Sequence, residues 1–414
     1  MNIRYSSLGF LLLLPLLIDA IVVETPYGRI EGFEYNSADV FLGVRYAKAP
    51  IAPEDGNRYP VMLYIHGGGF EFDTATNFGF KEIADNFVSA GIVFATLDYR
   101  DDFLPGNLGL WDQLSALEFV AEIISSFGGN PDDITAPPLS SDKAIGSHYF
   151  PYVDGRFFPS DLHDLVKDAP KIPTITGVTD MEAGLWAYNV QQNSIPVFGE
   201  SNETFIAVPP GKYESFSEED LKETLAKIAV NVSGLYPLLE EFFIQPQAQK
   251  SSFYLKQQVD IASDLTFVVP AFQEAIDKLH HKWPVHLYIE QHYCESPLRS
   301  KIPVKGTFHA NELFYLFGAS EIFPVEMNDA DKRFKRNFLE GLISFVKEGK
   351  PQIAGNEWKP IDEDDHFQFM SLNATSAMRS GFFEKRMKFW TEEVVKKVDL
   401  TELKTLLPQS ALNL

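Results

Sequence analysis

Three consecutive glycines end one of the most apolar runs of the chain, and their pattern is the first that suggests chemistry. Residues 61–65 are all apolar, and they are followed by His66 and then by glycines at 67–69. A backbone made of glycine can approach a substrate closely and direct its N–H groups at a developing oxyanion. The alternative is a tight turn after a strand, which accounts for one or two glycines more readily than for three.

The elements that would position such a loop follow from the hydrophobic pattern. Residues 61–65 and 91–97 are continuous apolar runs, which are typical of strands covered on both faces and hence of a parallel sheet. A further strand is predicted at 284–289, and an antiparallel edge at 21–25 and 40–44. Helices are expected at 79–89, 111–126, 217–230, 257–281 and 331–348. This alternation of strands and helices indicates an α/β fold.

Composition limits the classes of function. The chain has 414 residues, and its 35 Lys and Arg against 58 Asp and Glu give a formal net charge of −23. A surface this acidic repels a phosphate backbone, which excludes nucleic-acid binding. The same charge could attract a cationic substrate or could serve solubility alone. Cys294 is the only cysteine, so no intrachain disulfide can form, and we expect its side chain to be buried.

The start of the chain predicts export. Arg4 precedes an apolar run at residues 8–18 that is too short to span a bilayer, and Ala20 offers a small residue for cleavage. We therefore expect a signal peptide over residues 1–20 and no membrane span. Three sequons agree with a secreted glycoprotein, and they begin at Asn202, Asn231 and Asn373.

Beyond the signal peptide, the organisation of the chain looks simple. The sequence has no internal repeat and no Pro/Gly/Ser-rich linker that would mark a second domain. We expect a single domain over residues 21–397, followed by a polar, amphipathic tail over residues 398–414.

A series of motifs in a fixed order carries a family resemblance. Residues 41–50 read FLGVRYAKAP, residues 66–70 read HGGGF, and later motifs are PGNLGLWDQ at 105–113, FGGNP at 127–131 and DGRFFP at 154–159. In this series the chain resembles the type-B carboxylesterase and cholinesterase family over almost its whole length. The resemblance implies an α/β-hydrolase fold with a largely parallel central sheet flanked by helices, and acyl transfer from a carboxylic ester through a serine.

Two members of that family's catalytic triad have counterparts here. The resemblance implies that His309, in GTFHANEL, is the base and that Glu182, in TDMEAG, holds the imidazole tautomer. Asp180 fits the orienting role less well, because the family's acid directly precedes a small residue. Gly68 and Gly69 would be the oxyanion donors. We expect Glu182 and His309 to lie within hydrogen-bond reach and to face the glycine loop.

The nucleophile is missing from its expected place. In the family, FGGNP leads within a few residues into a strand and a Gly-Glu-Ser-Ala-Gly elbow, but here Thr135 is followed by Ala136 and two prolines. We therefore expect the elbow, its strand, its helix and the third oxyanion donor to be absent. Since that strand belongs in the middle of a parallel sheet, its loss predicts a gap or a rearranged sheet and a marginally stable protein prone to aggregate.

Other serines fit the role of nucleophile poorly. Ser201 follows Gly199 and Glu200 like the first half of an elbow, but Glu203 replaces the second glycine and Ser201 follows Glu182 in the chain instead of preceding it. Asn202 also begins a sequon. Ser140 and Ser141 have no elbow sequence around them.

Three functions therefore remain open. The first is a secreted carboxylesterase-family protein without ester-hydrolase activity. The second is an active serine carboxylesterase that acts on small carboxylic esters, either as an incomplete version of a longer chain or through an unrecognised nucleophile. The third is a non-catalytic adhesion or binding protein with an unidentified protein partner. No cofactor and no metal are expected for any of them.

Overall fold

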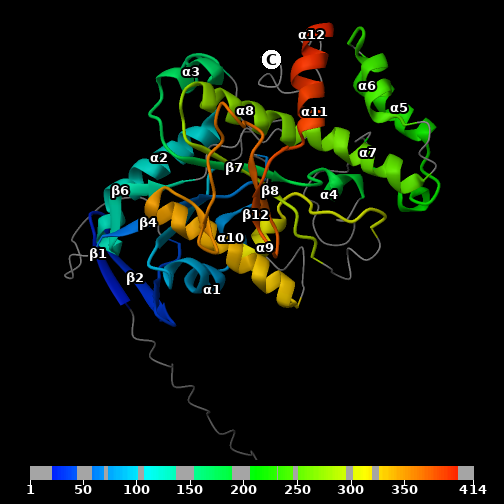
Figure 1. Ribbon diagram of the computed structural model, residues 1–414. Coiled ribbons are helices and arrows are strands. Elements are labelled where there is room, and N and C mark those ends of the chain that lie inside the picture. Colours follow the sequence, from blue (N-terminus) through cyan, green and yellow to red (C-terminus); the bar gives the residue numbers. More distant parts are fainter. Residues whose placement is uncertain are drawn as a thin grey trace, which may run out of the picture.

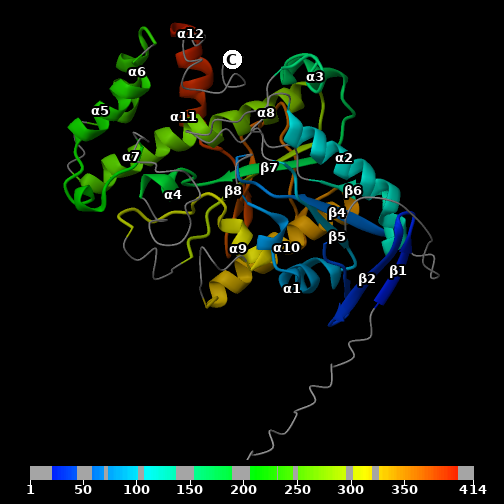
Figure 2. The ribbon, with the colours of Figure 1, turned by 180° about the vertical axis from the view of Figure 1, so that it is seen from behind.

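The computed structural model shows an α/β protein whose strands lie between two layers of helices (Figures 1 and 2). Helices α2, α3 and α8 lie on one side of the strands, and α1, α9 and α10 lie on the other. The structure describes residues 21–43, 58–69, 73–100, 107–136, 153–188, 206–230, 232–245, 250–294, 302–318 and 326–399.

A small antiparallel sheet forms the edge predicted from the first apolar runs. It contains β1 (Ile21–Thr25), β2 (Gly28–Tyr35) and β3 (Ala38–Val40), in that order. Gly28 has a φ of +113°, and the Thr25 hydroxyl donates to its carbonyl at 2.9 Å, which closes the turn between β1 and β2.

The strand that leads into the glycine loop lies at the centre of a parallel three-stranded sheet. This strand, β4 (Tyr59–Ile65), pairs on one side with β5 (Val93–Leu97) and on the other with β6 (Gly129–Thr135). Ile134 pairs with Val61, and Thr135 with Met62. The approach to the elbow therefore still forms a strand, which corrects in part the expectation that the strand is missing. The residues that follow, from 137 onward, lie outside the described part of the chain.

A second sheet carries the remaining parallel strands. Its order is β12 (Ala377–Arg379), β11 (Phe369–Leu372), β8 (Val285–Glu290) and β7 (Thr174–Thr179), with β11, β8 and β7 parallel. Within the described ranges, no hydrogen-bonded ladder joins this sheet to β4–β6. The predicted break in the sheet is thus present among these residues.

One hydrophobic core nevertheless spans both sheets. Tyr64 and Phe94 of the first sheet and Tyr288 of the second are partly buried and pack against one buried cluster, which includes Met370 of the second sheet. Phe317 closes this cluster, with its ring centroid 4.6 Å from that of Tyr64. The cluster is covered by α1 (Phe80–Ile83), α9 (Asn311–Phe317) and α10 (Asp329–Glu348). Side-chain packing therefore joins the two sheets where hydrogen bonds do not.

The opposite faces are covered separately. Leu63 and Leu97 pack under α2 (Leu108–Ile123), as the alternation of side chains along a strand requires. The second sheet is covered by α8 (Val269–His280). This helix continues from α7 (Ser251–Ser263) through a π-helical segment, Asp264–Val268. Both sheets are thus buried on two sides, as the continuous apolar runs predicted.

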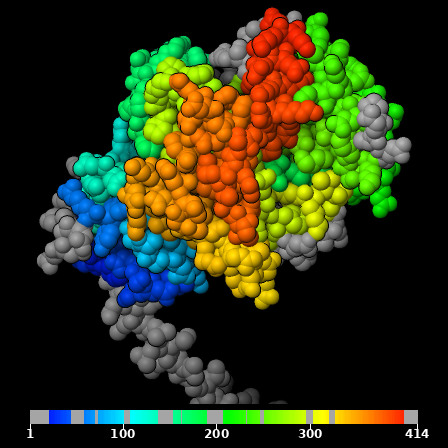
Figure 3. Space-filling model, in the orientation of Figure 1, coloured from blue at the N-terminus to red at the C-terminus, as the bar shows by residue number. Residues whose placement is uncertain are grey.

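The C-terminal helices pack against a lobe made by α5 (Glu218–Ile228) and α6 (Leu235–Phe243). In Figure 3 the red C-terminal segment lies directly beside this green lobe. Phe389 begins a π-helical turn, Phe389–Val394, and its ring stacks on that of Phe242 in α6 with centroids 4.0 Å apart. This turn follows α11 (Glu384–Lys388) and leads into α12 (Val395–Lys397). Cys294 is buried, as expected.

Candidate active site

Glu182 and His309 lie together, as the resemblance predicted. The Glu182 side chain follows the end of β7 and is only 6% exposed. Its Oε2 atom lies 2.8 Å from Nδ1 of His309, and its Oε1 atom accepts the backbone N–H of Thr179 at 2.6 Å. A carboxylate only accepts, so Nδ1 must carry the proton, and in the neutral ring Nε2 is then the basic nitrogen. This is the arrangement that a general base requires.

The backbone around the pair is held by a short ladder between two turns. Met181 N–H donates to the carbonyl of Thr307 at 3.0 Å, and His309 N–H donates to the carbonyl of Glu182 at 3.3 Å. Asp180 does not orient the imidazole; its Oδ1 accepts Thr307 N–H at 2.7 Å. Burial raises the pKa of Asp180 to about 6. Asp180 therefore fixes the loop that carries His309, a role that was not predicted from the sequence.

Ala310 directly follows the base and has an unusual backbone conformation. Its φ is +61°, in the left-handed region, and α9 begins at the next residue. A residue with a Cβ costs about 1–2 kcal/mol in this region. The strain lies where the chain turns His309 toward Glu182 and then enters α9.

Two aromatic rings flank the imidazole. The His309 ring stacks on Phe267 with centroids 4.5 Å apart, and it lies 5.3 Å from Trp186. The His309 side chain is 32% exposed, so the ring remains accessible. The imidazole therefore lies beside an apolar surface formed by these two rings. No role was predicted from the sequence for Trp186 or Phe267, although Trp186 lies only four residues after Glu182.

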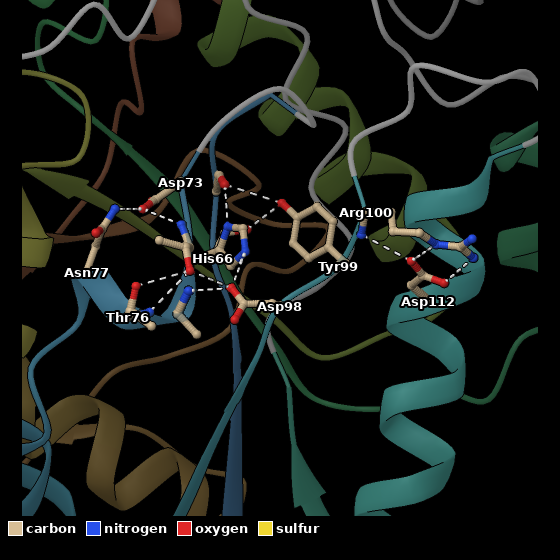
Figure 4. A network of polar contacts seen from close by, with 11 residues as sticks. His66, Asp73, Thr76, Asn77, Asp98, Tyr99, Arg100 and Asp112 are labelled. Carbon is tan, nitrogen blue, oxygen red and sulfur yellow. Dashed lines mark hydrogen bonds and ion pairs between the residues drawn. The ribbon is translucent and has the colours of Figure 1, made fainter. Parts of the chain in front are cut away.

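The glycine loop has the backbone that its sequence predicted. Gly68 has a φ of +112° and Gly69 a φ of +61°, both of which glycine adopts without strain. The Tyr99 hydroxyl reaches two carbonyls at the start of the loop, that of His66 at 2.8 Å and that of Gly67 at 3.2 Å (Figure 4). A trans peptide directs its N–H opposite to its C=O, so holding the Gly67 carbonyl also sets the direction of the Gly68 N–H.

Asp98 connects the loop to the segment that follows it. Its Oδ1 atom accepts the Thr74 hydroxyl at 2.8 Å and Ala75 N–H at 2.7 Å, and lies 3.6 Å from Nε2 of His66 (Figure 4). The His66 ring also stacks on Tyr99, with centroids 4.4 Å apart. Tyr99 and Asp98 thus brace the loop from the end of β5. No role was predicted from the sequence for either Tyr99 or Asp98.

Several predicted sites lie outside the described residues. These are the signal peptide, Ser140, Ser141, Ser201, Asn202, Asn231 and the tail beyond residue 399. Asn373 is described, and it lies in the turn between β11 and β12. Its Oδ1 atom accepts from Thr375 N–H at 2.7 Å and from the Thr375 hydroxyl at 3.0 Å.

The described ranges contain neither a metal site nor a membrane-spanning helix. No group of three or more His, Cys, Asp or Glu side chains in them could hold a metal ion. No helix in the same ranges has both the length and the hydropathy needed to cross a membrane.

Comparison with known proteins gives a consistent result. The chain matches the model of the carboxylesterase family in two pieces, residues 51–141 and residues 139–390. It is 25% identical to Gut esterase 1 of Caenorhabditis briggsae over 520 aligned residues, which cover 89% of this chain and 92% of the relative. It is 24% identical to Carboxylesterase 5A of Mus musculus, covering 83% and 72%, and 22% identical to Bile salt-activated lipase of Bos taurus, covering 80% and 71%.

Proposed function

The chain belongs to the carboxylesterase family, and on that premise we propose that it is a secreted relative of the carboxylic ester hydrolases that does not hydrolyse esters as written. The observation that carries the proposal is a contrast within one site. The Glu182–His309 pair and the braced glycine loop are present. The sequence contains no Gly-x-Ser-x-Gly elbow anywhere in its 414 residues.

The comparisons support a missing internal block. The two pieces of the family match overlap at residues 139–141, a few residues after the expected start of the elbow. The alignment with Gut esterase 1 spans 520 positions, whereas 89% of 414 residues is about 370. Roughly 150 positions of that relative therefore have no counterpart here. Losses inside the chain, rather than at its ends, account for most of this difference.

The chemistry explains why such a loss would silence the site. In a complete site of this family, Nε2 of the base takes the proton of a serine as its oxygen attacks the ester carbonyl, and backbone N–H groups stabilise the oxyanion. Without that serine, His309 can activate only water. Removing a triad nucleophile costs about six decades of rate, and each lost oxyanion donor costs on the order of a hundredfold more.

The test is turnover of a simple aryl acetate by the purified chain. We expect no hydrolysis above that of a His309→Ala variant, and no labelling by an organophosphate that modifies activated serines. Turnover that depends on His309 would contradict the proposal. Stoichiometric labelling at Ser201 would identify that residue as the nucleophile, and labelling of another serine would reveal a different site.

An active serine carboxylesterase is the second candidate. It is favoured by the hydrogen bond between Glu182 and His309, because this pair has no catalytic use in a chain without a nucleophilic serine. A peptide map or transcript across the junction between Thr135 and Ala136 separates the two. A longer product that carries an elbow there would make this chain an incomplete version of an enzyme for small carboxylic esters. A pure adhesion or binding protein is favoured less, because it has no need of the glycine loop and His309.

Secretion and glycosylation belong to the same proposal. They are supported by the apolar run after Arg4 and by the sequon at Asn373, which lies in a turn. We expect the protein in the medium of expressing eukaryotic cells, with an N-terminus near residue 21. Treatment with an N-glycosidase should lower its apparent mass, and an Asn373→Gln variant should show a smaller shift. Retention in the cell with an intact N-terminus would contradict secretion.

A further inference from the structure

A group of charged side chains is buried below the Glu182 turn, where helix α7 meets the C-terminal helix α11. Asp260 and Asp264 lie four residues apart on one face of α7 and its continuation. Arg386 of α11 forms an ion pair with Asp260, and its Nε atom lies 3.0 Å from Oδ1 of Asp264. Trp390 Nε1–H donates to the other oxygen of Asp264 at 3.0 Å, and Lys256 Nζ contacts both oxygens of Asp260 at 2.6 and 2.8 Å.

These side chains are largely removed from water. The Asp264 side chain is 0% exposed, that of Asp260 8% and that of Arg386 12%, whereas that of Lys256 is 38% exposed. Asp180, at the edge of the site, interacts electrostatically with Lys256 and Asp260. We define the buried charge cluster as the largely buried Asp260, Asp264 and Arg386 together with two less buried neighbours, Asp180 and Lys256.

The cluster has one negative charge too many. Fully ionised, its three carboxylates face two cations. The Glu182 carboxylate, which bonds to His309, is not a member of the cluster. An unbalanced charge costs several kcal/mol in the interior of a protein, and a buried group commonly removes it by changing its protonation state. One additional proton would neutralise the cluster.

We propose that the buried charge cluster binds one exchangeable proton, and that this proton stabilises the docking of the C-terminal helix α11 on α7. Because Ala183 N–H donates to the Ser263 hydroxyl at 3.0 Å, α7 is also bonded directly to the Glu182 turn. The proton site thus connects three elements: the turn after β7, helix α7 and helix α11. It does not depend on whether the chain hydrolyses esters.

The surroundings of each carboxylate agree with this assignment. Burial raises the pKa of Asp264 to about 7; the Arg386 guanidinium opposes the rise, and Asp260 adds to it. Burial also raises the pKa of Asp180 to about 6, and Thr307 N–H opposes that rise. Burial alone would lower the pKa of Arg386, but Asp264 and Asp260 outweigh it and raise it. Besides its five members, two titratable groups interact with the cluster: Glu182 and Tyr188.

The sign of the pH dependence follows from linkage. An unfolded Asp releases its proton near pH 4, whereas the cluster keeps one to about pH 7. Between these values the folded protein holds one more proton than the unfolded chain, so stability falls as pH rises. One proton corresponds to a tenfold change in the unfolding equilibrium constant for each pH unit.

The experiment measures denaturant unfolding of the full chain between pH 5 and pH 8. Asp264→Asn removes the group with the largest share of the proton, and Asp164→Asn is the matched control. Asp164 is exposed and paired with Lys167, which lowers its pKa, so it stays ionised across this range. We expect the unfolding constant of the Asp264→Asn variant to rise less steeply with pH than that of the native chain, by up to tenfold per unit. The Asp164→Asn variant should parallel the native chain.

Parallel curves for the native chain and Asp264→Asn would overturn the proposal. If Asp264→Asn does not fold, the native chain alone decides the question by infrared spectroscopy. The absorption of a buried protonated carboxylic acid should be present at pH 6 and absent at pH 9. Hydrogen exchange tests the link to α11: after correction for intrinsic rates, residues 384–394 should lose more protection than α10 between pH 6 and pH 8. Absence of the acid band, or equal loss in both helices, would refute the proton site or the docking role, respectively.

Discussion

Replacing Glu182 with Gln should move the proton on the His309 ring from one nitrogen to the other. Glu182 accepts two hydrogen bonds, one from Thr179 N–H at 2.6 Å and one from His309 Nδ1–H at 2.8 Å. A Gln amide has one accepting oxygen and one donating NH₂ group, so it can satisfy only one of these donors. The backbone N–H cannot change, but the imidazole can, by holding its proton on Nε2 and accepting at Nδ1.

The expected cost follows from the same two contacts. The variant exchanges two hydrogen bonds to a charged carboxylate, each worth about 1.5–3 kcal/mol, for two neutral ones worth about 0.5–1.5 kcal/mol each, which is a net loss of about 2–3 kcal/mol. We expect the free energy of unfolding to fall by about that amount. Nitrogen NMR of protein labelled at histidine, read on the neutral form of the ring, should show Nδ1–H at His309 in the native chain and Nε2–H in the variant.

Asp180→Asn is the control for this experiment. Its amide oxygen can still accept Thr307 N–H, so the loop should keep its position and the His309 ring should keep its Nδ1–H tautomer. A native His309 ring that already carries its proton on Nε2 would refute the hydrogen bond from Nδ1–H to Glu182. A Glu182→Gln variant that leaves both the tautomer and the stability unchanged would also refute it.

Three further substitutions test features around the site. Phe317→Ala should lower the free energy of unfolding by about 3–5 kcal/mol, because the buried Phe317 ring packs on Tyr64 and Phe94 of the first sheet; a loss below about 1 kcal/mol in denaturant titration would contradict that role. Ala310→Gly should raise it by about 0.5–1 kcal/mol by relieving the positive φ, whereas Ala310→Val should lower it, and the same titration compares the two. Tyr99→Phe should cost about 1 kcal/mol and increase amide exchange at Gly67 and its neighbours; exchange equal to that of the native chain would count against the brace.

The parts of the fold that the sequence predicted are those with the strongest hydrophobic patterns. Strands β4 and β5 contain the two continuous apolar runs, and β8 was predicted from a shorter run interrupted by His286; both faces of each strand are covered. The run at 40–44 gave a weaker result, because β3 ends at Val40. The single helix predicted at 257–281 is instead the end of α7 and the whole of α8, joined by a π-helical segment. Strands β7 and β11 were not predicted; β7 includes polar threonines and a glycine, which weaken the pattern.

The candidate site divides in a similar way. Glu182, His309 and the glycine loop were found because motifs mark their positions, and the hydrogen bond predicted between the first two is present. Their catalytic roles stay predictions. The supporting residues were missed because no local pattern marks them. Asp180 meets Thr307 across 127 positions of sequence, and Asp264 meets Trp390 across 126. Contacts of that kind depend on how the elements pack, which one sequence does not reveal.

The division of the strands into two sheets also has a consequence for the order of synthesis. All three strands of the first sheet come from residues 59–135, whereas the second sheet needs strands that extend to residue 379. Since a chain emerges from the ribosome N-terminus first, β4–β6 can assemble before any strand of the second sheet exists. The face that carries Tyr64 and Phe94 must then wait for α9 and α10 to cover it. During that interval a chaperone could find an apolar surface that the finished protein hides.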